Sequence, residues 1–400
     1  MEWESEPLVD IVESLHQGLN TAGEKIKFEE VGFPIIQTRN IENGQINLDH
    51  KIKFMSQGDW DKYNEKYKPQ VGDVFFTNIG TIGKTAIVHV EQDYLIHWNI
   101  FKIRPIPDKI TSAYLKYRLD YLTDTGFFTT TQKGGTVNFV TKKMMSSVEV
   151  PLPSIPEQKR IVAILDQAFA DIEQARAKTE QNLKNARELF ESKKMNLFEK
   201  LSITANLMPL PSVCNSIFAG GDAPKKGLYS KEKTETFNIP IYANAVKQNG
   251  LYGYTDYSRA NEPSITIAAR GSGTGHIELR KEPFLPIVRL IVLTPNKDIV
   301  HLEFLKHALQ TLDILRSGSA IPQLTVPMIK EYSIPVPSLD AQQTTVDELE
   351  LLKESIGRVE KIYQDKTVLL EALKKSILQK AFSGELTKTL EVDTNKGAVA

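Results

Sequence analysis

The sequence contains almost no cysteine. Cys214 is the single thiol among 400 residues, so the chain has no disulfide framework and no zinc site built from thiolates. This scarcity favours a reducing compartment, and we expect a cytoplasmic protein. Long apolar runs are missing as well, because no run approaches the roughly 18 residues of a membrane span. The acidic start MEWESEPLVD is unlike a secretory signal.

An excess of positive charge is also lacking. The 49 Lys and Arg residues are balanced by 50 Asp and Glu residues, which leaves a net charge of −1. The chain as a whole therefore has no basic footprint for nucleic acid. If it binds DNA, the positive charge must be local or supplied by partners.

Catalytic patterns are missing too. None of the seven histidines forms an H-x-x-x-H pair. The nuclease-like Glu191-Ser192-Lys193 falls in a charged helical stretch, and NIPIY at Asn238 lacks the paired prolines of an adenine-methyltransferase motif. No glycine-rich loop opens a βαβ unit for S-adenosylmethionine. We therefore expect no catalytic residue, no metal ligand and no cofactor bound by this chain.

What the sequence does contain is an internal repeat. VPLPS at Val150 matches IPVPS at Ile334, and Gln158 falls on Gln342 at the same offset. Three earlier segment pairs keep the same order: GGTVNFVTKKMM with GSAIPQLTVPMI, YLKYRL with FLKHAL, and FPIIQTRNIENGQI with IPIYANAVKQNGLY. The chain is thus a tandem duplication.

The repeat explains a stretch that resembles a phosphate-binding loop. TNIGTIGKT, from Thr77 to Thr85, ends in Gly-Lys-Thr but has Asn78 where such a loop needs glycine. Its second copy is AARGSGTGHIEL, in which Lys84 is replaced by His276 while Gly80 and Gly83 align with glycines. We predict a tight turn with positive φ, which also lets an external partner approach the backbone.

Each copy has the same two-part organisation. Short β-branched and aromatic runs broken by Gly, Pro and Asn come first and predict an α+β or mostly β domain. A charged segment of about 40 residues follows, with the alternating spacings of 3 and 4 that are typical of a coiled-coil seam, and a helix of that length is about 60 Å long. The seam positions are Val162, Leu165, Phe169, Ile172, Arg176, Thr179, Leu183, Ala186 and Phe190, then Val346, Leu349, Ile356, Val359, Tyr363, Leu370, Leu373 and Ile377.

We expect the two helices to pair as an antiparallel coiled coil between two tandem-repeat domains related by a pseudo-twofold axis. The predicted boundaries are 1–153 and 203–337 for the domains, 154–202 and 338–386 for the helices, and 387–400 for a flexible tail.

The ordered motifs resemble the specificity subunits of type I restriction-modification systems. The GTIGK turn after GDVFF, the P-x-P-x-x-E-Q helix start at Pro151, and QKAFSGEL at Gln379 are recurrent in that family. The second helix start departs from the pattern because it lacks the Glu. The resemblance implies two target-recognition domains that read the halves of a bipartite, asymmetric DNA site, with the helices fixing the spacer between the halves.

The resemblance also implies the partners. Two methyltransferase subunits would methylate adenine with S-adenosylmethionine, and restriction subunits would use ATP and Mg to translocate and cut the DNA. The specificity chain itself would be non-catalytic. With near-neutral charge, we expect it to bind DNA weakly without its partners.

Polar residues beside the repeated glycines are the candidates for contact with DNA, because Arg, Lys, Asn, Gln, Ser and Thr hydrogen-bond to base edges. In the first copy they are Thr38, Arg39, Asn40, Asn78, Lys84, Lys133, Thr136 and Asn138. In the second copy they are Asn244, Lys247, Arg270, Ser272, His276, Arg316, Ser317, Ser319 and Gln323. The segment His97-Trp98-Asn99 is a further candidate, although an aromatic residue on a strand is more often part of the core.

Two other functions are compatible with the sequence. One is a coiled-coil scaffold that bridges two proteins through its globular ends. The other is an enzyme, such as a nuclease, with an unrecognised site. A neighbouring reading frame for an adenine methyltransferase would favour the specificity subunit over both.

Overall fold

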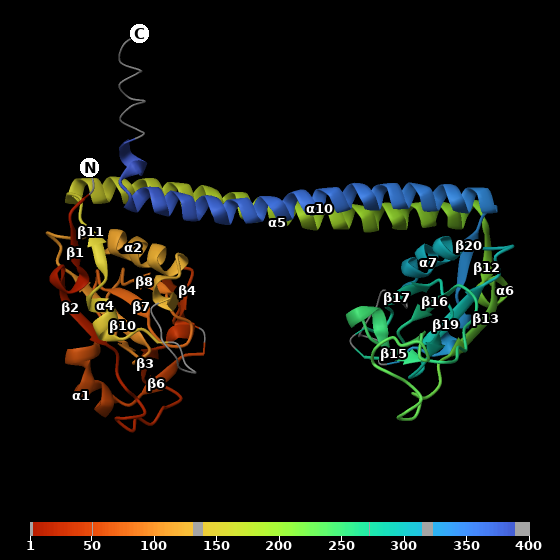
Figure 1. The fold of residues 1–400 in the computed structure, drawn as a ribbon, viewed down its shortest axis with the longest axis horizontal. Helices are drawn as coiled ribbons and strands as arrows, with labels where there is room; N and C mark the ends of the chain where they lie inside the picture. Colours follow the sequence, from red (N-terminus) through yellow and green to blue (C-terminus); the bar gives the residue numbers. More distant parts are fainter. Residues whose placement is uncertain (1–2, 50, 131–138, 272, 314–322, 389–400) are drawn as a thin grey trace, which may run out of the picture. The chain divides into compact units, whose positions relative to one another are not determined.

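The computed structural model describes residues 3–49, 51–130, 139–271, 273–313 and 323–388. It divides into two compact units, unit 1 with Met1–Thr179 and Asp365–Ala400, and unit 2 with Glu180–Gln364. Each unit combines one globular domain with a part of both long helices. Each is described by itself below, and Figure 1 shows its elements.

Unit 1 begins with a β-rich domain. Its strands are β1 (Ser5–Pro7), β2 (Val12–Gln17), β3 (Phe33–Ile36), β4 (Ile41–Glu42), β5 (Gln45–Ile46), β6 (Lys53–Met55), β7 (Val74–Thr77), β8 (Thr85–Ile87), β9 (Leu95–Ile96), β10 (Ile100–Pro105) and β11 (Glu149–Pro151). Its helices before the long one are η1 (Leu8–Asp10), η2 (Thr38–Asn40), α1 (Gln57–Tyr67), α2 (Ser112–Asp124), α3 (Phe127–Thr130) and α4 (Lys142–Ser146).

Unit 2 contains a second domain. Its strands are β12 (Asn206–Pro209), β13 (Cys214–Ala219), β14 (Ile239–Tyr242), β15 (Leu251–Thr255), β16 (Ser264–Ile267), β17 (Ile277–Arg280), β18 (Leu285–Pro286), β19 (Ile291–Pro295) and β20 (Ser333–Val336). Its short helices are α6 (Leu210–Val213), η3 (Lys247–Gly250), α7 (Leu302–Thr311) and α9 (Val326–Lys330).

The two domains share the same strand orders, except that the two-stranded β4-β5 sheet of unit 1 has no counterpart among the described strands of unit 2. The four-stranded sheet has the order β2-β10-β7-β8 in unit 1 and β13-β19-β16-β17 in unit 2. The three-stranded sheets, β6-β3-β9 and β15-β14-β18, each join one parallel pair to one antiparallel pair. The first and last strands of each domain also pair, β1 with β11 and β12 with β20. The structure therefore confirms the duplication and gives both copies an α+β fold.

Apolar patterning explains the central strands. All four residues of β7 and all four of β16 are buried, as expected for strands that are covered on both faces. In unit 1 one face of the four-stranded sheet packs against α2. The same core contains Tyr114 of α2 and Leu165 and Leu378 of the two long helices. Figure 1 shows α2 and α7 between the sheet of their unit and the long helices.

The long helices are α5 (Ile155–Thr204) and α10 (Leu339–Phe382). In unit 1 the Lys374 ammonium lies 5.2 Å from the centre of the Phe169 ring, and Arg176 pairs with Glu371 at 3.3 Å. In unit 2 Arg187 pairs with Glu360 at 2.7 Å, and Lys193 pairs with Glu348 at 2.9 Å. Partner numbers fall along α10 as they rise along α5, so the helix segments within each unit run in opposite directions.

The predicted seam is wrong at Leu373. This side chain is 48% exposed, whereas Lys374 and Thr367 are partly buried. After Tyr363 the inward positions are Thr367, Leu370 and Lys374, so the spacing changes from 3-then-4 to 4-then-3. In a straight helix with 3.6 residues per turn, the buried positions gradually move to later residues than a strict heptad predicts, here from Leu373 to Lys374.

A buried glutamine at the start of each long helix is hydrogen-bonded to the backbone of the adjoining domain. Gln158 is fully buried, its Nε2 donates to the carbonyl oxygens of Lys109 and Pro153 at 2.8 and 3.0 Å, and its Oε1 accepts from the Thr111 amide at 2.9 Å. Gln342 repeats this pattern in unit 2 with Ile299, Pro337 and His301. The glutamines aligned in the sequence are therefore equivalent in structure.

Candidate nucleic-acid interface

The repeated glycine turn joins β7 to β8 in unit 1. The Thr77 amide donates to the Lys84 carbonyl at 2.9 Å, and the Gly83 amide donates to the Thr77 carbonyl at 2.9 Å. Gly80 and Gly83 have φ values of 80° and 90°, which is the left-handed region that favours glycine. The predicted positive φ is confirmed.

Unit 2 builds the same turn between β16 and β17. The Ala268 amide donates to the His276 carbonyl at 2.9 Å, and the Gly275 amide donates to the Ala268 carbonyl at 2.8 Å. Gly271 and Gly275 have φ values of 84° and 86°. The turn leads from one antiparallel strand to the next, not from a strand into a helix as a phosphate-binding loop does. The resemblance of TNIGTIGKT to a nucleotide site is accidental.

A second segment follows β3 or β14. In unit 1 Arg39 is exposed and its guanidinium donates to the Gln37 carboxamide at 3.1 Å. Asn40 is buried, and its Oδ1 accepts from the Gln37 amide at 3.0 Å. Thr38 has a buried hydroxyl oxygen that finds no hydrogen-bond partner among the described residues. Only Arg39 of the three predicted residues therefore presents a polar group to solvent.

The equivalent segment of unit 2 contains Asn244 and Lys247. Asn244 joins two loops, because its Nδ2 donates to the Val288 carbonyl and its Oδ1 accepts from the Ala269 amide at 2.8 Å. Lys247 is exposed. Asn244 thus positions the loops while Lys247 faces outward.

A third segment, at Phe139 in unit 1 and Gln323 in unit 2, forms an isolated β-bridge with the glycine turn. Ile79 pairs with Phe139 in unit 1, and Arg270 pairs with Gln323 in unit 2. Asn78 is 1% exposed and its carbonyl accepts from the Val140 amide at 2.8 Å, so its side chain does not face solvent. The predicted residues Lys133, Thr136, Asn138, Ser272, Arg316, Ser317 and Ser319 lie outside the described residues.

The remaining predicted groups have protein partners. Arg270 is exposed, and its Nη2 donates to Gln323 Oε1 at 2.9 Å. His276 Nε2 lies 2.9 Å from Glu278 Oε1. Lys84 Nζ reaches the Thr38 carbonyl at 3.4 Å. These contacts orient the side chains beside the turns.

A fourth segment was named from the sequence only in its first copy, as His97-Trp98-Asn99. It is the turn before β10 or β19, in which the Trp98 amide donates to the Leu19 carbonyl at 2.9 Å and the Val288 amide donates to the Gly221 carbonyl at 2.7 Å. Asn99 of unit 1 is therefore equivalent to Arg289 of unit 2, which is an exposed arginine. Aligning YLIHWNIFKI with FLPIVRLIVL would have found Arg289.

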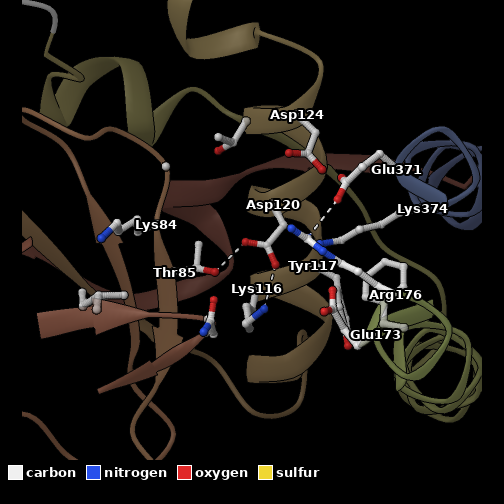
Figure 2. A pocket seen from close by; sticks show the side chains of 16 residues that line it. Lys84, Thr85, Lys116, Tyr117, Asp120, Asp124, Glu173, Arg176, Glu371 and Lys374 are labelled. Atoms are coloured by element: carbon white, nitrogen blue, oxygen red, sulfur yellow. Dashed lines mark hydrogen bonds and ion pairs between the residues drawn. The ribbon is translucent and has the colours of Figure 1, made fainter. Parts of the chain in front are cut away.

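Unit 1 also has a polar cavity of about 730 Å³ where the domain meets the long helices. Figure 2 shows Lys116 and Asp120 from α2 in its centre, with Arg176 from α5 and Lys374 and Glu371 from α10 on the helical side. The Lys116–Asp120 and Arg176–Glu371 ion pairs are 2.7 and 3.3 Å long, and Thr85 donates to Asp120 at 2.5 Å. These ion pairs and the hydrogen bond lie between residues of the cavity wall, and the cavity lies where the domain of unit 1 meets α5 and α10.

No group of three or more His, Cys, Asp or Glu residues in the described part of the chain could hold a metal ion. No helix within it is long and apolar enough to cross a membrane.

Comparisons with known proteins agree on one family. A family model described as the type I restriction modification DNA specificity domain matches residues 1–185 and 202–364. A putative type I specificity subunit of Mycoplasma pneumoniae is 38% identical over 134 residues, which are 34% of this chain and 39% of that relative. A putative type I restriction enzyme specificity subunit of Methanocaldococcus jannaschii is 24% identical over 96% of this chain and 94% of its own length.

Solved structures share the fold. A chain from a structure of the type I R-M system superposes with a TM-score of 0.76 at 17% identity, over 96% of this chain and 98% of the other. The HsdS subunit from Thermoanaerobacter tengcongensis gives a TM-score of 0.60 at 17% identity, over 96% and 97% of the two chains. The match to the family model covers both repeats, and this chain belongs to the type I restriction-modification DNA specificity family.

Proposed function

We propose that this chain is the DNA-recognition subunit of a type I restriction-modification complex. In this proposal each unit reads one half of a bipartite, asymmetric target, and the complex includes two methyltransferase subunits and restriction subunits. S-adenosylmethionine, ATP and Mg would be bound by those partners. The observation that carries the proposal is the repetition of one fold whose equivalent loops carry different polar side chains.

The loop chemistry supports base recognition. At equivalent positions unit 1 has Ile79, Lys84 and Asn99, whereas unit 2 has Arg270, His276 and Arg289. Amino, amide and guanidinium groups distinguish base pairs in the major groove by their hydrogen-bonding patterns. Two scaffolds with the same strand order and different side chains would therefore read different sequences, as an asymmetric target requires.

We infer a revised set of contacts within this proposal. The exposed Arg39, Lys247 and Arg270 face the duplex, together with Lys84, His276 and Gln323 beside them. Asn40, Asn78 and Asn244 support the loops from within. The unlike side chains then select the sequence while the shared backbone keeps the loops in position.

The antiparallel pairing of α5 and α10 in each unit supports a continuous coiled coil as the second part of the proposal. Pseudo-twofold symmetry between the repeats belongs to the same proposal and rests on the matching strand orders. Burial raises the pKa of the Cys214 thiol to about 12 and keeps it protonated at neutral pH, so this thiol is a poor nucleophile.

Duplex binding tests the proposal. We expect the complex with methyltransferase subunits to bind a cognate duplex tightly and with strong salt dependence, and the isolated chain to bind it weakly because its net charge is −1. Equal affinity of the complex for cognate and scrambled duplexes would contradict DNA recognition. Tight specific binding by the isolated chain would contradict the need for partners.

A further inference from the structure

The turn at Val288 and Arg289 has an unusual backbone. Val288 has a φ of 53° and Arg289 a φ of 60°. A β-branched residue such as valine disfavours this left-handed region, and such strain persists only where the surroundings fix it. Strained residues of this kind collect at binding sites. The turn is therefore a candidate site and not an ordinary connection between β18 and β19.

Hydrogen bonds hold the strained turn on both sides. The Val288 amide donates to the Gly221 carbonyl at 2.7 Å, and the Arg289 amide donates to the Gly220 carbonyl at 3.2 Å. The Asn244 carboxamide donates to the Val288 carbonyl from the other side. A Cβ on Gly220 would lie 2.6 Å from the Pro286 carbonyl carbon, so glycine is required for this close approach. The backbone beneath Arg289 is thus fixed before any ligand arrives.

The side chain on this fixed backbone is available. Arg289 is exposed, and its guanidinium has no hydrogen-bond or ion-pair partner among the residues that the structure describes. It lines a cavity of about 420 Å³ together with Arg270, Gln323 and Asp222. Arg270 and Gln323 are bound to each other at 2.9 Å. The guanidinium N–H groups of Arg289 are therefore available to a ligand in this cavity.

The equivalent turn of unit 1 offers different chemistry. Asn99 Oδ1 lies 2.9 Å from His97 Nδ1, so that side chain already has a protein partner. Trp98, the equivalent of Val288, is 39% exposed. The two copies thus share the position and the closing hydrogen bond of the turn, Ile100 to His97 and Leu290 to Ile287, but only unit 2 has positive φ values and an exposed guanidinium there. This difference is expected of a residue that determines sequence preference.

We propose that Arg289 and Asp222 read one G·C base pair of the target duplex. The Arg289 guanidinium donates to guanine O6 and N7, and the Asp222 carboxylate accepts from the amino group of the paired cytosine. The proposal deepens the DNA-recognition function and rests on it. It assigns this contact to the half of the target that unit 2 reads.

Selection from a randomised duplex library tests the assignment. The full chain in complex with its methyltransferase subunits is compared with Arg289→Ala, Arg289→Lys and a charge control, Lys297→Ala. Lys297 is exposed and lies just beyond the opposite end of β19. We expect Arg289→Ala to lose a G·C preference at one position by about 10–100-fold and Lys297→Ala to lose none. Arg289→Lys should lose most of it as well, because an ammonium lacks the fork.

The outcomes distinguish failure of the Arg289 contact from failure of DNA recognition itself. If the unsubstituted complex selects a motif that Arg289→Ala leaves unchanged, the inference is overturned and DNA recognition stands. If Arg289→Ala weakens all duplexes equally and Arg289→Lys restores binding, Arg289 is a phosphate contact and the inference is also overturned. If the unsubstituted complex selects no motif, the function and the inference fall together.

Discussion

Gly80 and Gly83 share one turn but require glycine for different reasons. Both have positive φ. A Cβ on Gly80 would meet no atom within 4 Å, whereas a Cβ on Gly83 would lie 2.2 Å from Thr123 Cγ2 on α2. Gly83 therefore fixes the packing of the turn against the helix, while Gly80 supplies only its backbone conformation.

Alanine substitutions should separate the two effects. We expect Gly80→Ala to lower the free energy of unfolding by about 1–2 kcal/mol through backbone strain alone. Gly83→Ala should cost about 2 kcal/mol more, because the added methyl group overpacks against Thr123. Urea denaturation measures both, and Thr123→Ala should recover part of the loss only in the Gly83→Ala background. Equal losses for the two glycines would refute the packing explanation.

His307 makes the stability of unit 2 depend on pH. Burial, with Lys194 and Lys306 nearby, lowers its pKa to about 4. The unfolded chain gains a proton near pH 6.5, whereas the folded chain stays neutral until about pH 4. The stabilising contribution of neutral His307 is thus complete above pH 6.5 and is lost as the pH falls through this window.

His307→Gln tests this dependence. Between pH 7 and pH 5 we expect the unsubstituted chain to lose about 2 kcal/mol of stability through this residue. The variant should lack that part of the loss, as measured by urea denaturation at both pH values. Parallel stability curves for the two proteins would show that His307 does not titrate as described.

At the scale of elements, the glutamine contacts at the helix starts matter more than the exposed ion pairs. Gln158 satisfies three buried backbone groups, whereas Arg187 is 60% exposed in its pair with Glu360. An exposed pair of this kind contributes only about 0.2–1 kcal/mol. The attachment of each domain to its long helix therefore depends mainly on the buried amide.

Replacing Gln158 by leucine tests whether attachment of the domain depends on the buried amide. We expect Gln158→Leu to destabilise the protein by about 2–4 kcal/mol, because it leaves the Thr111 amide and two carbonyl groups without partners. Gln167→Leu is the matched control, since Gln167 is exposed and its side chain donates to the Asp171 carboxylate one helical turn away. Thermal unfolding should separate the two variants clearly. A similar midpoint for both would contradict the role given to Gln158.

Sequence repetition was sufficient to predict some of these elements and insufficient for others. The duplication, the glycine turns and the Gln158–Gln342 equivalence follow from aligned residues, since equal local sequence imposes equal turns and helix starts. Leu373 was misplaced because heptad counting ignores the helical drift after Tyr363. Asn40 and Asn78 were expected at the surface, but their amides satisfy loop backbone, and burial of this kind depends on tertiary contacts that one sequence does not contain.

At the scale of the whole molecule, duplication gives one chain two copies of the same domain. Each unit has its own core, its own sheets and its own set of loops. We expect the effects on binding of one substitution in each unit to add.

Paired arginine substitutions test this independence. Arg39 in unit 1 and Arg270 in unit 2 are both exposed and oriented by a glutamine. We expect Arg39→Ala and Arg270→Ala each to cost about 1–3 kcal/mol in binding of the complex to its cognate duplex. Each should relax a different half of the motif, and the double variant should show the sum. Relaxation of the same half by both variants would contradict separate recognition.

Mapping of adenine methylation in cells tests the central claim most directly. Cells that express the methyltransferase subunits with this chain are compared with cells that lack it. The proposed function predicts a bipartite, gapped motif that is methylated only when the chain is present. A gapless motif, or methylation that does not depend on the chain, would contradict recognition by two repeated units and favour a scaffold.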